Sequence, residues 1–166
     1  MGVLAKLVDS TLFFFFTVIA VAAPLIDAPT CLPAGIFPDV LLDLNRWYSR
    51  EYGDYLLVEK PHFFVGLVWL ELLFQWPLAI ANLYAILTGK SWFRTTCLVY
   101  GVSNFTSMIA ILAEMMGSGK ASEKLLMMYC PFLGFGLLAT LRGLFVHSGK
   151  SSPVARRTVL TRKKRA

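Results

Sequence analysis

The chain has 166 residues, of which 57% are hydrophobic and 16% are charged, and its net charge is +6 at neutral pH. This composition is too apolar for a soluble domain. The positive charge is concentrated in the C-terminal tail, where it indicates contact with anionic lipid headgroups and no nucleic acid. Three cysteines and the absence of metal-binding or phosphate-binding motifs predict no disulfide framework, no metal and no cofactor.

Four hydrophobic runs are long enough to cross a bilayer as helices. They are expected at residues 7–26, 63–87, 95–116 and 125–145. The first run also fits a cleaved signal peptide, but its apolar stretch exceeds the roughly 7 to 15 residues of a signal-peptide core, so we expect a retained helix. The sequence therefore predicts an all-α fold, with a polytopic four-helix membrane bundle at residues 1–147 and a basic cytosolic tail at 148–166.

The first loop is expected to contain a short amphipathic helix on the luminal side. Pro38 can begin this helix, and apolar side chains such as Leu44 and Tyr48 then recur at helical spacing. The helix would lie on the membrane or cap the bundle, and Gly53 would end it. For Asp54 we favour a structural role over direct ligand contact, because an aspartate carboxylate can cap a turn by accepting hydrogen bonds from backbone N–H groups.

The second span carries Glu71 near its middle, where an ionised carboxylate costs at least about 2.5 to 3.5 kcal/mol. At regular helical spacing Gln75 and Asn82 fall on the same side, so we expect a polar stripe that faces protein, water or a ligand. Asp27 follows the first span, and the two carboxylates are expected to share one cavity in the luminal half, with a single proton held on Glu71. Such a cavity would bind a sterol, or a cationic amphiphile with its amine on Asp27.

The third span also has one polar side, formed by Tyr100, Ser103, Asn104 and Ser107. Helix packing accounts for the two serines, whereas packing and cavity lining are equally expected for Tyr100 and Asn104. Tyr129 in the fourth span is expected to contact the hydrophobic body of a ligand. The polar sides of the second and third spans therefore predict an interior that the two spans share.

Lysine and arginine residues near the span ends predict the orientation of the chain. Lys6, Arg94 and the basic tail should be cytosolic, so both termini of this multi-pass protein should face the cytosol. Arg142 is expected to extend to the cytosolic headgroups. Lys163 and Lys164 match the dilysine signal that retrieves membrane proteins to the endoplasmic reticulum, so we expect the protein in that membrane.

Motifs distributed along residues 24–145 resemble the sigma-2 receptor (transmembrane protein 97) family. These motifs are Leu32-Pro33 to Asp39, Arg46-Trp47-Tyr48, Gly53-Asp54-Tyr55-Leu56-Leu57, Glu71-Leu72-Leu73-Phe74-Gln75-Trp76-Pro77, Trp92-Phe93-Arg94-Thr95 and Tyr129-Cys130-Pro131-Phe132. The resemblance implies the EXPERA fold, a four-helix bundle of the endoplasmic reticulum membrane that is associated with sterol handling and with binding of cationic drugs and oxysterol-like molecules.

The resemblance also implies roles for individual residues. Asp27 matches the partner of the ligand amine, Asp54 matches the aspartate that orders the pocket, and Glu71 matches the buried acid beside it. Positions that line the family pocket are matched by Tyr48, Gln75 and Tyr129. Ser103 and Asn104 depart from the usual pair of the family.

Two functions follow as alternatives. The first is a non-enzymatic protein that binds sterols, oxysterols and cationic amphiphiles and contributes to cholesterol homeostasis or sterol trafficking, with the bilayer and a sterol-transport membrane protein as partners. The second is a sterol Δ8-Δ7 isomerase, resembling the emopamil-binding isomerase, in which Glu71 and Asp27 transfer protons. We favour the first, because the isomerase pattern has a histidine where this chain has Ala23, and a tryptophan that the fourth span lacks. The sequence does not distinguish a monomer from a homodimer.

Overall fold

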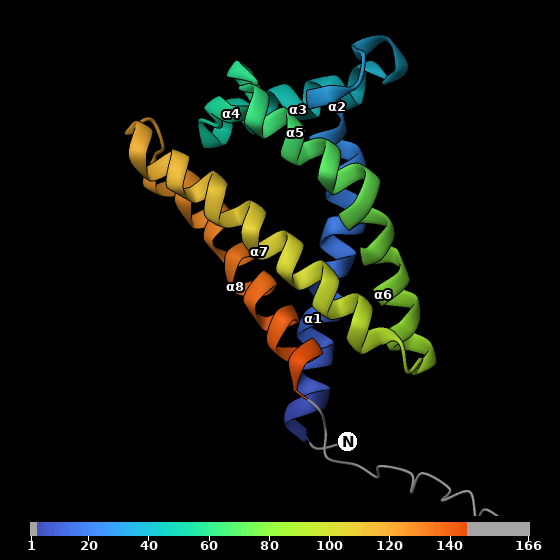
Figure 1. The fold of residues 1–166 in the computed structure, drawn as a ribbon. Helices are drawn as coiled ribbons and strands as arrows, with labels where there is room; N and C mark the ends of the chain where they lie inside the picture. Colours follow the sequence, from blue (N-terminus) through green and yellow to red (C-terminus); the bar gives the residue numbers. More distant parts are fainter. Residues whose placement is uncertain (1–2, 146–166) are drawn as a thin grey trace, which may run out of the picture.

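The computed structural model describes residues 3–145, which form a bundle of helices (Figure 1). Within these residues, four segments are long and apolar enough to cross a membrane: Val3–Cys31, His62–Thr88, Phe93–Ser118 and Glu123–Leu144. The predicted all-α fold with four spans is therefore confirmed. The basic tail, including the predicted retrieval signal Lys163 and Lys164, lies outside the described residues.

The first two spans are each interrupted by a π-helical turn. The first consists of α1 (Val3–Ala22), the π turn η1 (Ala23–Asp27) and α2 (Ala28–Cys31), and the second of α5 (His62–Leu70), the π turn η3 (Glu71–Gln75) and α6 (Trp76–Thr88). The third and fourth spans are the single helices α7 (Phe93–Ser118) and α8 (Glu123–Leu144). The loop between the first two spans forms a 3-10 turn η2 (Ala34–Ile36), α3 (Asp39–Tyr52) and α4 (Tyr55–Glu59).

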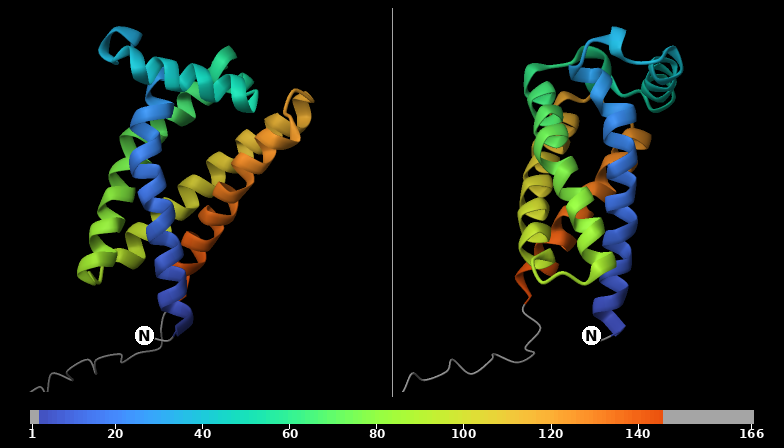
Figure 2. Two further views of the ribbon diagram at one scale, coloured as in Figure 1. Left: turned by 180° about the vertical axis from the view of Figure 1, so that it is seen from behind. Right: turned by 90° about the vertical axis from the view of Figure 1, so that its right-hand side faces the viewer.

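The expected helix of the first loop is α3, which lies across one end of the spans (Figure 2). It ends at Gly53, whose φ of 66° is left-handed and therefore favours glycine. We call this the α3 end of the bundle. At the opposite end α1 begins and α8 ends, and we call it the terminal end (Figure 1). Both described chain ends therefore lie at one end of the bundle, as four spans require.

Helices α7 and α8 form an antiparallel hairpin whose backbones approach closely at glycines. A Cβ atom on Gly136 would lie 2.8 Å from the backbone nitrogen of Phe105, and one on Gly143 would lie 2.7 Å from Cα of Leu98. Small residues at such crossings let membrane helices pack without the hydrophobic effect that drives packing in water. The hairpin therefore fixes the positions of the α7 and α8 side chains that face the other two spans.

At the terminal end, an ion pair joins the first and last spans. Nε of Arg142 lies 2.6 Å from Oδ1 of Asp9, and its second bond, from Nη2 to Oδ2, is 3.1 Å long. Only 15% and 14% of these two side chains is exposed, and the guanidinium lies 5.4 Å from the ring centroid of Phe93. Arg142 therefore does not extend alone to the headgroups as expected, because a carboxylate on the neighbouring helix gives it a bidentate partner.

Candidate functional site

Asp27 is the last residue of the π turn η1, which forms around Pro24. A proline has no N–H, so the carbonyl of Ala20, four residues earlier, loses its helical donor. The indole Nε1 of Trp76 donates a 3.0 Å hydrogen bond to this carbonyl from the second span. The wide turn that carries Asp27 is thus fastened to the neighbouring helix.

Glu71 begins the second π turn, η3. The backbone N–H of Trp76 donates to the carbonyl of Glu71, five residues back, and Pro77 follows directly. Turns of this kind are rare and are frequently found at functional sites. Both acidic residues that the sequence singled out therefore lie in locally widened helix.

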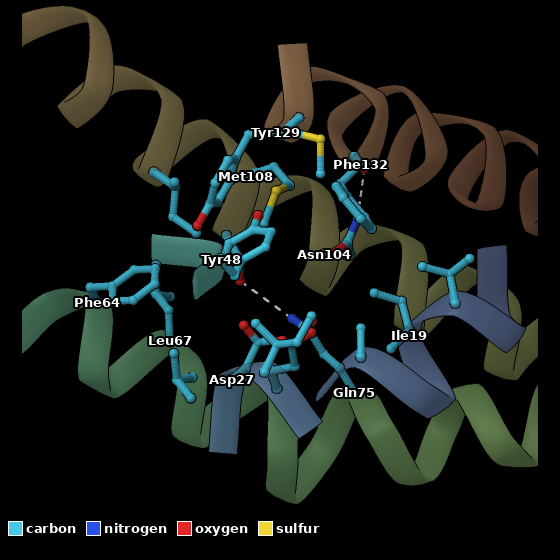
Figure 3. Close-up of a pocket in the computed structure, with 18 residues that line it drawn as sticks. Ile19, Asp27, Tyr48, Phe64, Leu67, Gln75, Asn104, Met108, Tyr129 and Phe132 are labelled. Atoms are coloured by element: carbon cyan, nitrogen blue, oxygen red, sulfur yellow. Dashed lines mark hydrogen bonds between the residues drawn. The ribbon is translucent and has the colours of Figure 1, made fainter. Parts of the chain in front are cut away.

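A cavity of about 220 Å³ lies between the spans, beneath α3 (Figure 3). Its walls come from η1, α3, α5, η3, α7 and α8, together with the last turns of α1. Six of the seven predicted ligand-binding residues line it: Asp27, Tyr48, Glu71, Gln75, Asn104 and Tyr129. The structure therefore brings together side chains that are up to a hundred positions apart in the sequence.

Tyr100 is the predicted ligand-binding residue that does not line this cavity. Its side chain is fully buried in the centre of the bundle, where the ring packs edge-on against Phe16 at a centroid distance of 5.0 Å. Asn82 is also buried away from the cavity, and its Oδ1 accepts a 2.6 Å hydrogen bond from Thr96. The expected stripe from Glu71 through Asn82 thus does not face the cavity as one surface.

The carboxylates of Asp27 and Glu71 have no cationic partner in the described part of the chain. The ion pairs found in residues 3–145 use other acids, namely Asp9, Asp43, Glu51 and Glu59. Both side chains are half-buried and line the same cavity. An unpaired carboxylate in an apolar surrounding is costly and attracts a cation or a hydrogen-bond donor.

Two amides on the cavity wall are held by hydrogen bonds. Nε2 of Gln75 donates to the hydroxyl oxygens of Ser103 and Ser107, at 3.0 and 3.3 Å. Nδ2 of Asn104 donates to the backbone carbonyl of Phe132 at 2.9 Å. The serines thus do more than pack helices, because they fix the position of a cavity residue.

Asp54 lies at the N-cap of α4 and is fully buried. Its Oδ1 accepts from the backbone N–H groups of Leu56 and Leu57, at 3.1 and 3.3 Å, and its Oδ2 accepts from the Tyr129 hydroxyl at 2.7 Å. Burial raises the pKa of Asp54, and these hydrogen bonds offset part of the rise. Asp54 therefore orients Tyr129, a cavity residue, without lining the cavity itself.

Tyr48 brings α3 into contact with the cavity. Burial, and then the nearby carboxylates of Asp54 and Asp27, raise the pKa of its phenol, so Tyr48 stays neutral.

The cap formed by α3 and α4 is joined to the α7–α8 hairpin by two ion pairs, from Lys120 to Glu59 and from Lys124 to Glu51. These side chains are about half exposed, so each pair contributes little to stability.

Sequence reasoning missed the apolar part of the lining. Ile19, Phe64, Leu67 and Met108 face the cavity (Figure 3), yet the same residue types cover the outer surface of the spans. Apolar side chains in an apolar helix carry no signal that separates a cavity wall from a lipid-facing surface. Only the polar members of the lining could be found from the sequence.

Comparisons with known proteins agree with this architecture. The family model of the EXPERA (EXPanded EBP) superfamily matches residues 40–143. Sigma intracellular receptor 2 of Xenopus tropicalis is 30% identical over 158 residues, which cover 87% of this chain and 92% of that relative. The proteins of the same name from Homo sapiens and Macaca fascicularis are each 36% identical over 88 residues, 52% of this chain and 50% of each relative.

Proposed function

Because the chain belongs to the EXPERA family of membrane proteins, we propose that it binds sterols, oxysterols and cationic amphiphiles in the cavity between its spans. The observation that carries this proposal is the pair of carboxylates, Asp27 and Glu71, which line one apolar-walled cavity and have no cationic partner in residues 3–145. Family membership supports a sterol-related role in a membrane. The choice of ligand class is drawn from the chemistry of the cavity.

For a cationic amphiphile, Asp27 is the proposed counter-ion. It lies near the α3 end, beside the neutral phenol of Tyr48, so an ammonium group there would gain a Coulomb interaction and an aromatic face. The hydrophobic body of the ligand would lie against Ile19, Leu67 and Met108. Their apolar surfaces would also accept the rings of a sterol.

The size of the cavity bears on how such a ligand enters. Its volume of about 220 Å³ is below the roughly 300–1,000 Å³ of pockets that enclose a drug-sized molecule. A sterol would therefore need some lining side chains to move. Met108 is suited to this, because an unbranched thioether changes rotamer easily.

We place this binding function in the endoplasmic reticulum membrane, with both termini cytosolic and the α3 end luminal. The basic residues near the terminal end support the orientation, and the dilysine pattern at Lys163 and Lys164 supports the compartment. In that membrane the protein would contribute to cholesterol homeostasis or to sterol trafficking, together with a sterol-transport membrane protein. Ligand binding in the luminal leaflet is the step that the cavity would perform.

A sterol isomerase is the second candidate, because both acids line one cavity and could transfer a proton to and from a sterol ring. Position 23, where the isomerase pattern has a histidine, is a fully buried alanine, and no tryptophan occurs in α8. We therefore propose binding without catalysis. Conversion of a Δ8 sterol to its Δ7 isomer by the purified protein would overturn this part of the proposal.

The binding proposal is tested by measuring affinity for a cationic amphiphile and for a neutral sterol in the wild type and in three variants. Asp27→Asn should weaken amine binding by at least about tenfold, because truncating a buried charge pair costs roughly 2–5 kcal/mol, and should change sterol affinity much less. Glu71→Gln should lower amine affinity less than Asp27→Asn does. The control is Asp43→Asn, an exposed acid of α3 that pairs with Arg46. Unchanged amine affinity in Asp27→Asn would show that this residue is not the counter-ion.

A further inference from the structure

Besides the two acids, the cavity has a polar residue at Asn104 of α7. This side chain is only 2% exposed and lines the cavity. The direction of its amide is unambiguous, because Nδ2 donates at 2.9 Å to the carbonyl of Phe132, which can only accept. The amide oxygen, Oδ1, is therefore the amide atom that does not bond to Phe132.

Oδ1 of Asn104 faces the cavity. It is not among the polar atoms that the protein encloses without a partner, and no donor within residues 3–145 is bonded to it. Figure 3 shows the amide nitrogen toward Phe132 and the oxygen on the other side. The cavity wall thus presents a fixed hydrogen-bond acceptor that has no donor among residues 3–145.

The position of this acceptor is fixed by the α7–α8 hairpin. A Cβ atom on Gly136 would lie 2.8 Å from Nδ2 of Asn104, so the amide occupies the space that a larger residue would fill. The amide cannot rotate without losing its bond to Phe132 and placing two acceptors together. Asn104 therefore offers an acceptor in one place and in one orientation.

Asn104 and Asp27 line the cavity from different spans, the third and the first. Phe132 packs with Ile19 in the apolar cluster toward the terminal end, whereas Ile26 and Tyr129 pack in the cluster toward the α3 end. Apolar side chains such as Leu67 and Met108 line the cavity together with the polar side chains of Gln75 and Ser107.

We propose that the cavity selects an amphiphile with two hydrogen-bond donors, an ammonium or hydroxyl group at Asp27 and a second donor at Oδ1 of Asn104. This inference rests on the proposed binding function and specifies its ligand class. A ligand that ends in an apolar group would displace water from Oδ1 and leave a buried acceptor unpaired. Asn104 is thus the specificity-determining residue for the far end of the ligand.

The test uses primary-amine amphiphiles of matched chain length that end in a hydroxyl, a ketone or a methyl group. Affinities are measured on the full chain in lipid nanodiscs. On the wild-type protein, the hydroxyl compound should bind about tenfold more tightly than the other two, the ratio given by one hydrogen bond to a buried acceptor. The advantage should peak at one chain length, because the distance between the two polar positions is fixed.

Asn104→Ala should abolish the difference in affinity between the hydroxyl and methyl compounds, because it removes both the acceptor that the hydroxyl group reaches and the unpaired acceptor that the methyl group leaves. The matched control is Thr106→Ala on the same helix, because Thr106 is exposed and its hydroxyl donates to its own helix at Val102. Asp27→Asn should weaken all three compounds together.

A hydroxyl advantage that is absent from the wild type, or that persists in Asn104→Ala, overturns the role of Asn104. Failure of all three amines to bind, or their indifference to Asp27→Asn, overturns the binding proposal itself. If Asn104→Ala does not fold, the dependence of the hydroxyl advantage on chain length in the wild type decides the inference. A flat dependence refutes it.

Discussion

Replacing Asp54 with alanine tests whether this residue holds the cavity wall in place. The change removes the N-cap of α4, worth about 0.5–2 kcal/mol, and the acceptor for the Tyr129 hydroxyl, a hydrogen bond to a carboxylate worth about 1.5–3 kcal/mol. Burial raises the pKa of Asp54, so the buried carboxylate carries a desolvation cost. Removing the carboxylate recovers this cost and offsets part of the loss in stability. We expect Asp54→Ala to lower the free energy of unfolding by roughly 2–4 kcal/mol.

The assay is thermal unfolding of the purified protein in detergent, where a loss of this size corresponds to a fall in Tm of roughly 5–15 °C. Tyr129→Phe should cost less than Asp54→Ala, because it leaves the cap intact. The double variant should cost less than the sum of the two single variants, since both remove the same bond. A loss below about 1 kcal/mol in Asp54→Ala, or full additivity, would refute the reasoning.

The raised pKa of Asp54 gives the same site a pH dependence. Between the unfolded and the folded pKa, the folded state binds more protons, so the contribution of Asp54 to stability falls as pH rises through this window. Asp54→Asn keeps an acceptor for the backbone N–H groups of Leu56 and Leu57 and does not titrate. Its stability relative to the wild type should therefore improve from acidic to neutral pH, which unfolding at several pH values measures. A constant difference would contradict the assignment.

Three further changes test the framework around the site. Arg142→Ala should destabilise the protein by about 3–5 kcal/mol in chemical unfolding, because it leaves Asp9 unpaired in a mostly buried position, and an unchanged midpoint would refute this. Gly136→Ala should lower Tm by several degrees, whereas Gly134→Ala, where a Cβ meets nothing within 4 Å, should not; equal effects would show that the close approach of α7 and α8 is not limiting. Trp76→Phe should cost about 1–3 kcal/mol in thermal unfolding, because it leaves a buried carbonyl without its donor, and a neutral result would contradict that role.

The spans and the acids could be predicted from the sequence because bilayer thickness sets the length of a hydrophobic run and makes a charge within it conspicuous. The ends of the second span were placed within one residue, at His62 and Thr88. The pairing of Arg142 with Asp9 could not be predicted, since the two residues are 133 positions apart and share no local pattern. The contacts that assemble the cavity belong to the packing of the helices, which periodicity in one helix does not specify.

The polar stripe predicted for the second span fails at Asn82 for a different reason. A regular helix turns about 100° per residue, but the π turn at Glu71–Gln75 holds about one residue more than an α turn. Later side chains are therefore displaced by roughly 100°. Gln75 still faces the cavity, whereas Asn82 contacts Thr96. Tyr100 was placed on the correct side of α7, but periodicity cannot distinguish a filled centre of the bundle from a cavity one turn away.

The two π turns also bear on how this site can change over generations. Because each turn accommodates one extra residue while the helix on either side keeps its course, each is a place where the gene can lose a single codon without disturbing the packing of the span. Such a deletion at Leu25 or Leu73 would narrow the turn beside Asp27 or Glu71 and leave the rest of the bundle in register. The shape of the cavity can therefore diverge among relatives while the fold that holds it stays the same.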